Sequence, residues 1–252
     1  MQIKLLSLAF LLSSIGFAQD YYWQQEAHYQ IDVELDDENN ILSGSENLNY
    51  INHSPDILRE VYLHLYWNAF QPNSMMDVRS RNIPDPDSRV GDRIFHLKPE
   101  EMGYTKIKKA WINGTEIVHE TIRTILKLSD FSIEPNESVV IRLEFETQVP
   151  IQIRRSGRDN KQGISYTMTQ WYPKVAAYDQ HGWHIDQYVG REFYGEWGSF
   201  DVCITMDSSF VLGGTGVLQN QSQLSQTFGY NNEDKLNEPE RYTKDNSKNT
   251  WH

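Results

Sequence analysis

Hydrophobic and polar residues alternate along much of this chain of 252 residues, as they do in strands with one buried face. Residues 29–35 (YQIDVEL) alternate cleanly, and a polar turn follows at 36–40. Alternation resumes over residues 41–51, so the pattern predicts a β-hairpin. Residues 58–67 (LREVYLHLYW) carry apolar or aromatic side chains on both faces, which predicts a strand covered on both sides.

The same pattern continues through the middle of the chain. Residues 104–112 alternate, and the dipeptide Asn113-Gly114 that follows is a strong hairpin signal. Further strands are predicted at 116–118, 122–128 and 138–149, whereas no stretch longer than ten residues has the period of an α-helix. We therefore expect an all-β domain, a multi-stranded antiparallel β-sandwich or saddle-shaped sheet.

An aromatic-rich stretch covers residues 163–218, which hold three of the seven Trp and five of the fourteen Tyr. Residues 198–206 alternate and predict a strand. Residues 211–218 are two short apolar runs around a glycine-rich turn, which predicts a hairpin after that strand.

The two ends of the chain differ from this β pattern. Residues 1–18 resemble a secretory signal peptide, with a positive charge at Lys4, an apolar run over 5–12 and a small residue at Ala18. The apolar run is too short to cross a bilayer as a helix. We expect the protein to be exported, to the periplasm or outside the cell, with no transmembrane segment.

The rest of the chain divides by composition into a β domain over residues 19–218 and a polar hairpin or linker over 219–252. Within the β domain, proline-rich residues 68–99 predict a long loop or excursion. We expect the polar stretch to lead to a further domain outside this chain.

The charge balance and the cysteine count exclude some functions. The formal net charge is −12 and no basic cluster is present, which argues against nucleic-acid binding. Cys203 is the single cysteine, so no internal disulfide can form, and its place in an alternating run is that of a chemically idle strand residue.

Two segments carry residues that could bind a metal. His119-Glu120 begins like the zinc motif HExxH, but Arg123 replaces the second histidine, and a guanidinium cannot ligate zinc. In YDQHGWHID, His181 and His184 stand between two aspartates, and a tight turn at Gly182 could gather them around zinc. The same residues also fit an exposed turn with local hydrogen bonds. We find no complete catalytic apparatus in the sequence.

Two long segments resemble the N-terminal β domain of gluzincin (thermolysin-like) zinc aminopeptidases, in a form common among exported bacterial members. They are YQIDVELDDENNILSGSENLNYINHSPDILREVYLHLYWNAF at 29–70 and TQWYPKVAAYDQHGWHIDQYVGREFYGEWGSFDVCITMDSSFVLGGTGVL at 169–218. The resemblance implies a saddle-shaped β domain that precedes a zinc domain, which carries HExxH and a GxMEN segment. Neither motif occurs in this sequence.

The resemblance also implies a role for one residue, Gln170 in TMTQWYP, which matches a glutamine that lines the first substrate pocket of the family. The alternative is that Gln170 merely satisfies backbone groups of its loop. On this interpretation, the chain supports the fold and one wall of a peptide pocket, while a C-terminal zinc domain performs catalysis. The chain alone is then expected to be inactive and to hold no zinc.

A second function remains open for the same residues. The Trp and Tyr side chains of 171–197 could line a carbohydrate- or peptide-binding site on a free-standing β-sandwich.

Overall fold

The computed structural model describes residues 22–85, 87–190, 193–228 and 247–252. The predicted signal peptide at 1–18 and the middle of the polar stretch lie outside these residues. The strands in the described part are β1 (Glu26–Asp36), β2 (Ile41–Ile51), β3 (Val61–His64), β4 (Tyr104–Ile112), β5 (Thr115–Ile117), β6 (His119–Ile122), β7 (Ile125–Leu128), β8 (Ser138–Gln148), β9 (Gly157–Arg158), β10 (Tyr166–Thr167), β11 (Lys174–Val175), β12 (Tyr178–Asp179), β13 (Gly182–Trp183), β14 (Trp197–Asp207) and β15 (Lys248–Trp251). The helical segments there are the 3₁₀ turns η1 (Tyr66–Ala69), η2 (Arg93–His96) and η3 (Pro99–Glu101), and the helices α2 (Met75–Asn82) and α3 (Gln221–Phe228).

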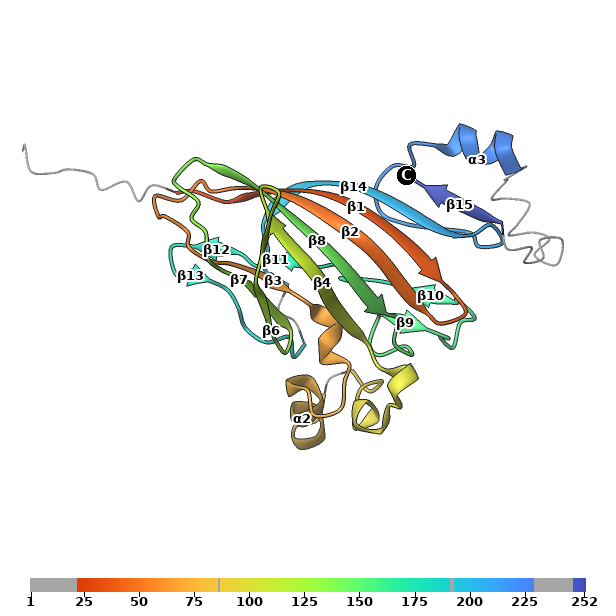
Figure 1. Cartoon of the computed structure of the whole chain (residues 1–252). Coiled ribbons are helices and arrows are strands. Elements are labelled where there is room, and N and C mark those ends of the chain that lie inside the picture. Colours follow the sequence, from red (N-terminus) through yellow and green to blue (C-terminus); the bar gives the residue numbers. More distant parts are fainter. Residues whose placement is uncertain (1–21, 86, 191–192, 229–246) are drawn as a thin grey trace, which may run out of the picture.

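A seven-stranded sheet with the order β15-β14-β1-β2-β8-β4-β5 forms most of the molecule (Figure 1). Its strands are antiparallel except for β1 and β14, which run parallel. The predicted hairpin of β1 and β2 is present, and Asn40 takes φ 59° in its turn. The all-β prediction is confirmed, and the arrangement fits a sandwich or saddle.

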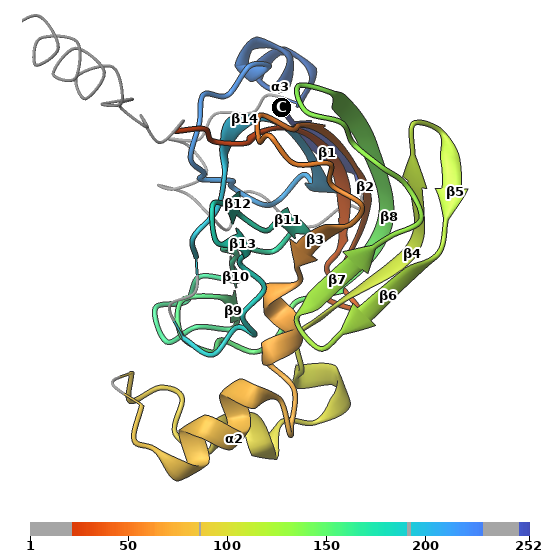
Figure 2. The same cartoon turned by 90° about the vertical axis from the view of Figure 1, so that its left-hand side faces the viewer.

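A smaller sheet with the order β11-β3-β7-β6 packs in the hollow side of the large sheet, which curves around it (Figure 2). Alternate residues of the large sheet, such as Ile31, Leu48 and Leu143, are at most 1% exposed. They belong to one core with Leu63 and Leu126 of the smaller sheet. Burial of the apolar face of each sheet against the other stabilises this sandwich.

Left-handed backbone at two turns fixes the hairpins in the middle of the chain. Asn113 (φ 49°) and Gly114 (φ 83°) form the predicted turn between β4 and β5. Arg123 (φ 58°) reverses the chain between β6 and β7, so that Ile122 pairs with Ile125. The prediction of one strand over 122–128 was therefore wrong.

The segment after β14 contradicts the predicted hairpin. No strand forms within 208–220, and Val211 and Val217 are 39% and 80% exposed. These apolar runs have no strand to pair with in the described part of the chain, because β14 already pairs with β1 on one side and with β15 on the other. A Cβ at Gly198 would lie 1.5 Å from the carbonyl oxygen of Ala27, so the close pairing of β14 with β1 requires glycine there.

The proline-rich excursion at 68–99 contains η1, α2 and η2, and it projects from one end of the molecule (Figure 1). Ser74 caps α2 by accepting a hydrogen bond from the Asp77 amide. The polar stretch 219–252 contains α3 and β15, and β15 extends the large sheet. No helix in the described part of the chain is long and apolar enough to cross a membrane.

Candidate functional site

Gln170 lies in the loop between β10 and β11 and has a left-handed backbone, with φ 55°. This conformation costs a residue with a β-carbon about 1–2 kcal/mol, and such strain is common at functional sites. The side-chain oxygen Oε1 is buried and has no hydrogen-bond partner among the described residues. A buried acceptor without a partner costs a further ~1–3 kcal/mol. Gln170 therefore carries two locally unfavourable features, a left-handed backbone and an unpaired buried oxygen, within the described part of the chain.

The residue before Gln170 is firmly held. The Trp67 indole nitrogen donates to the Thr169 carbonyl oxygen at 3.0 Å. The Ser156 hydroxyl donates to the same oxygen at 3.1 Å and lies 2.5 Å from the Thr169 hydroxyl. These contacts join η1, the segment after β8 and the loop, so the position of Gln170 is set by three separate parts of the chain.

Gln170 borders a small cavity of about 10 Å³, which has room for roughly one water molecule. We call it the Gln170 hollow. Its walls are mostly aromatic, and the rings of Tyr66, Tyr188 and Phe193 contact one another with centroids 5.2–5.3 Å apart. The other lining residues are Trp67, Phe70, Arg154, Arg155, Ser156 and Thr169.

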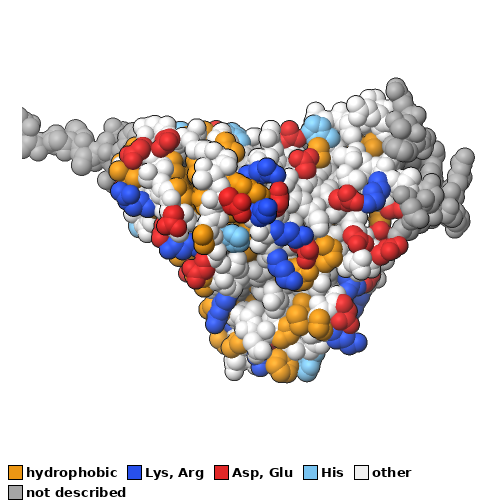
Figure 3. All heavy atoms as spheres, in the orientation of Figure 1, with side chains coloured by type: hydrophobic (Ala, Val, Ile, Leu, Met, Phe, Trp, Pro, Cys, Tyr) orange, Lys and Arg blue, Asp and Glu red, His pale blue; other side chains and the backbone are white. Residues whose placement is uncertain are grey.

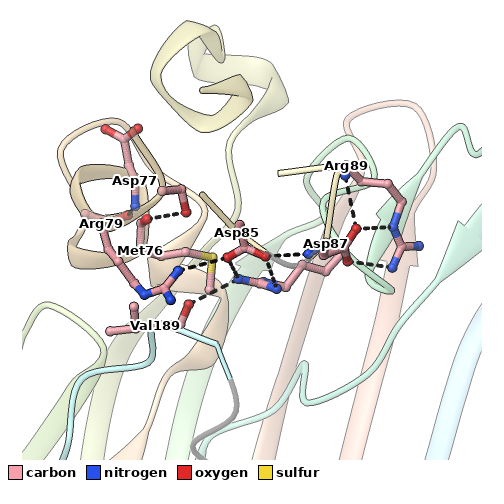
Figure 4. A network of polar contacts seen from close by, with 10 residues as sticks. Met76, Asp77, Arg79, Asp85, Asp87, Arg89 and Val189 are labelled. Atoms are coloured by element: carbon pink, nitrogen blue, oxygen red, sulfur yellow. Dashed lines mark hydrogen bonds and ion pairs between the residues drawn. The ribbon is translucent and has the colours of Figure 1, made fainter. Parts of the chain in front are cut away.

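Arg154 connects the hollow to the proline-rich excursion. Figure 4 shows Asp85 of that excursion among its polar contacts, with Val189 nearby. The two terminal nitrogens of Arg154 donate to the Asp85 carboxylate at 3.2 and 2.6 Å, and Nη2 also donates to the Val189 carbonyl oxygen at 3.3 Å. Burial raises the pKa of Asp85, but the Arg154 hydrogen bonds and charge, with a contribution from Arg79, leave this pKa below its usual value. The ionised pair therefore fixes the excursion against the wall of the hollow.

Two other cations near this part of the fold are not neutralised. The Arg155 guanidinium lies 4.9 Å from the centre of the Phe193 ring and forms no ion pair with any described residue. Lys174 on β11 also lacks a carboxylate partner among the described residues, and burial lowers its pKa.

The structure brings together only part of the predicted metal cluster. The His184 Nε2 atom lies 2.8 Å from the Asp179 carboxylate, which also accepts hydrogen bonds from the Tyr194 hydroxyl and the His181 amide. The side chains of His181 and Asp186 take no part in this pair. Within the described residues no three His, Cys, Asp or Glu side chains converge on a possible ion. The alternative of a turn with local hydrogen bonds describes this hairpin.

The sequence analysis did not single out Glu196, whose carboxylate lies beside Tyr178 and Asp179 of the same hairpin. Its carboxylate accepts a hydrogen bond from the Tyr178 amide at 2.8 Å. Burial raises the pKa of Glu196 to about 7, and the nearby Asp179 charge acts in the same direction. Glu196 is distant in sequence from the YDQHGWHID segment, so only the fold reveals the pairing.

The HExxH-like segment lies in β6, with Arg123 in the turn that follows. An HExxH motif presents its ligands from a helix, so an extended strand followed by a turn does not build one.

Comparison with solved structures finds several proteins that resemble this chain. A two-domain M1 zinc metallopeptidase bound to L-tryptophan matches 91% of this chain with a TM-score of 0.50 and 14% sequence identity. An M1 zinc metallopeptidase from Deinococcus radiodurans bound to a Tyr-Ser-Ala substrate matches 90% with a TM-score of 0.49 and 14% identity. The Legionella pneumophila aminopeptidase A in complex with aspartic acid matches 80% with a TM-score of 0.39 and 11% identity.

The chain spans only part of these proteins, 39% of the first, 38% of the second and 19% of the third. No protein-family model matches the sequence, and the comparison with curated proteins also gives no match. At 14% identity the likeness to the first structure concerns the fold. The described chain therefore has the β fold found in one part of an M1 zinc metallopeptidase.

Proposed function

We propose that this chain is the N-terminal β domain of an exported zinc metallopeptidase of the aminopeptidase type, with its catalytic zinc domain outside the present sequence. The observation that carries the proposal is Gln170, strained and with a buried, unpaired amide oxygen beside an aromatic hollow. An oxygen in this state gains a partner when a donor such as a peptide amino group or amide N–H arrives. Gln170 thus forms part of a substrate-pocket wall.

In the part of the chain that the structure describes, no group of side chains fits a zinc centre. A protein zinc site needs at least three protein ligands, and the described hairpin supplies only the facing pair of Asp179 and His184. The sequence contains neither HExxH nor GxMEN. Zinc and the catalytic groups therefore belong to the second domain in this proposal, and the β domain contributes positioning.

The reading frame that follows the codon of His252 gives the most direct test. We expect it to continue into a segment with HExxH. A stop codon directly after His252 would contradict the proposal and favour a free-standing binding domain.

Gln170 provides the functional test in the protein that includes the zinc domain. Gln170→Ala is expected to lower kcat/KM for an aminoacyl substrate by about tenfold, which corresponds to ~1.4 kcal/mol of transition-state binding. Gln162→Ala is the matched control, because Gln162 is exposed and lies in the nearby turn between β9 and β10. Equal kcat/KM in the Gln170→Ala variant and the wild-type protein would remove Gln170 from the pocket.

Elemental analysis of the chain alone tests where zinc binds. We expect less than one zinc atom per chain and no hydrolysis of aminoacyl substrates. One bound zinc per chain that is lost on replacing His181 and His184 would instead place a metal site in the β12–β13 hairpin.

A further inference from the structure

A second and larger concavity lies on the part of the domain that carries the β12–β13 hairpin. It has a volume of about 800 Å³, within the range of small-molecule sites, and no residue lines both it and the Gln170 hollow. We call it the Trp183 groove. Its lining residues are Ile57, Leu58, Arg59, Glu60, Ser129, Asp130, Phe131, Ser132, Tyr178 and Trp183.

One wall of the Trp183 groove is an aromatic cluster held rigidly in place. The Trp183 ring packs on Tyr178, Tyr62 and Tyr50 with centroids 5.0, 5.7 and 6.2 Å away. The Tyr178 hydroxyl donates to the Asp56 carboxylate at 2.9 Å, which ties the β12–β13 hairpin to the segment before β3. The aromatic surface is therefore formed before any ligand arrives.

Some polar groups of the groove are already paired, such as Glu60 with Lys127, whereas others have no partner among the described residues. The exposed side chains of Arg59 and Asp130 make no hydrogen bond or ion pair with other described residues. The Trp183 indole N–H has no partner within the described part either, and its nitrogen is not a buried atom. The groove thus offers free donors at Arg59 and Trp183 and a free acceptor at Asp130.

The aromatic wall and the unpaired donors and acceptor of the groove together favour one class of ligand over others. Hydroxyl groups both donate and accept, so a polyhydroxylated ligand matches donors and acceptors set beside one another. The C–H faces of sugar rings are apolar and suit an aromatic wall. Because one free cation and one free anion line the groove, a neutral ligand is favoured over a polyanion. On the face drawn in Figure 3, acidic and basic side chains are interspersed, without a large field of one sign.

A peptide fits the groove less well. Peptides commonly bind by adding a strand to an open backbone edge. Here the two backbone segments of the groove already bond to each other, from the Leu58 amide to the Ile133 carbonyl at 3.0 Å and from the Ile133 amide to the Leu58 carbonyl at 2.8 Å. From these observations we infer that the Trp183 groove binds a neutral oligosaccharide, a binding activity independent of the proposed peptidase role.

Titration of the purified full chain with cellotetraose, maltotetraose and chitotetraose tests the inference, with tryptophan fluorescence and calorimetry as readouts. We expect saturable binding of at least one tetrasaccharide and no binding of the tripeptide Ala-Ala-Ala. Arg59→Ala and Asp130→Gly should each raise the dissociation constant for the tetrasaccharide by about tenfold, because each removes a charged hydrogen-bonding group. Glycine suits position 130, where φ is 71°, so the second variant keeps the backbone.

Lys161→Ala serves as the matched control, since Lys161 is exposed in the β9–β10 turn, at the opposite end of the sheet from β12–β13 (Figure 1). Circular dichroism confirms that each variant is folded. Three outcomes overturn the inference: no tetrasaccharide binds at millimolar concentration, only the tripeptide binds, or Arg59→Ala and Asp130→Gly bind as tightly as Lys161→Ala.

Discussion

Gln170 has an unfavourable backbone and an unpaired buried oxygen, so its stability cost should be measurable on this chain alone. Gln170→Gly removes both features, and we expect the variant to be more stable by about 1 kcal/mol, or roughly 2–4 °C in Tm. Thermal unfolding followed by circular dichroism gives the comparison. If Gln170 only satisfied backbone groups of its loop, the same change would lower Tm.

Glu46 on β2 is a fully buried carboxyl group, and neither of its oxygens has a hydrogen-bond partner among the residues that the structure describes. It faces the core between Ile31 and Leu143, with Tyr29 and Tyr172 as the titratable groups nearby. Burial raises the pKa of Glu46 well above its usual value of 4.5. The native protein therefore holds the proton after the unfolded chain has released it.

The proton that Glu46 holds in the native protein determines whether the free energy of unfolding rises or falls with pH. Between pH 4.5 and the native pKa, the unfolded chain binds fewer protons, so the free energy of unfolding falls as pH rises, by at most about 1.4 kcal/mol per pH unit. Glu46→Gln should flatten this slope between pH 5 and pH 7. Chemical denaturation at several pH values measures it. An unchanged slope in Glu46→Gln would show that Glu46 does not cause it.

At the scale of elements, the β12–β13 hairpin is held by the segment that precedes β14. Glu196 accepts from the Tyr178 amide, Tyr194 donates to Asp179, and the Tyr194 ring contacts His184 edge-on at 4.8 Å. Tyr188 and Phe193 at the start of this segment line the Gln170 hollow. The hairpin and the hollow are thus joined by a short stretch of chain.

Glu196 should make this attachment sensitive to pH. Because the pKa of Glu196 is raised to about 7, its stabilising contribution is complete below pH 4.5 and is lost as pH rises toward and through 7. Hydrogen exchange at the Tyr178 amide, corrected for the intrinsic rate, should show less protection at pH 8 than at pH 6. In Glu196→Gln, which keeps an acceptor oxygen, the protection should be similar at both pH values. If protection of the Tyr178 amide depended equally on pH in the wild-type protein and in Glu196→Gln, Glu196 would not be the cause.

At the scale of the whole molecule, the described part of the large sheet is open along the first half of β14. β15 pairs only with residues 204–207, while Trp197 and Phe200 are 77% and 50% exposed. An apolar, unpaired strand edge favours association between copies. We expect the chain alone to self-associate with increasing concentration, as measured by size-exclusion chromatography with light scattering.

Trp197→Lys should reduce this self-association, because a charge at a strand edge opposes pairing. Val140→Lys on the outer face of β8 is the control, since Val140 is 44% exposed away from that edge. A wild-type monomer with a sharp, reversible melt would count against the prediction and favour an autonomous binding domain.

The alternation of apolar and polar residues determined the strands of the large sheet. In 29–35 every second side chain is apolar, and these side chains are the buried ones in β1. In 41–51 the apolar Leu42, Leu48 and Tyr50 are buried in β2, and Glu46 is buried on the same face. Asn113-Gly114 determined its turn because both residues tolerate positive φ. The turn at Arg123 carried no such signal. The apolar runs at 211–218 led to the wrong prediction of a hairpin, because a local pattern does not show whether a partner strand is available.

For the candidate site, the resemblance of TMTQWYP singled out Gln170, but only the tertiary structure supplied the aromatic hollow and the unpaired oxygen. The hollow is built from η1, the segment after β8 and the stretch before β14, which lie far apart in the sequence. The same holds for Glu196 beside Asp179 and for Arg59 and Trp183 in the lining of one groove. Local sequence determines which face of a strand is apolar, whereas long-range packing decides which polar groups meet and which are left without a partner.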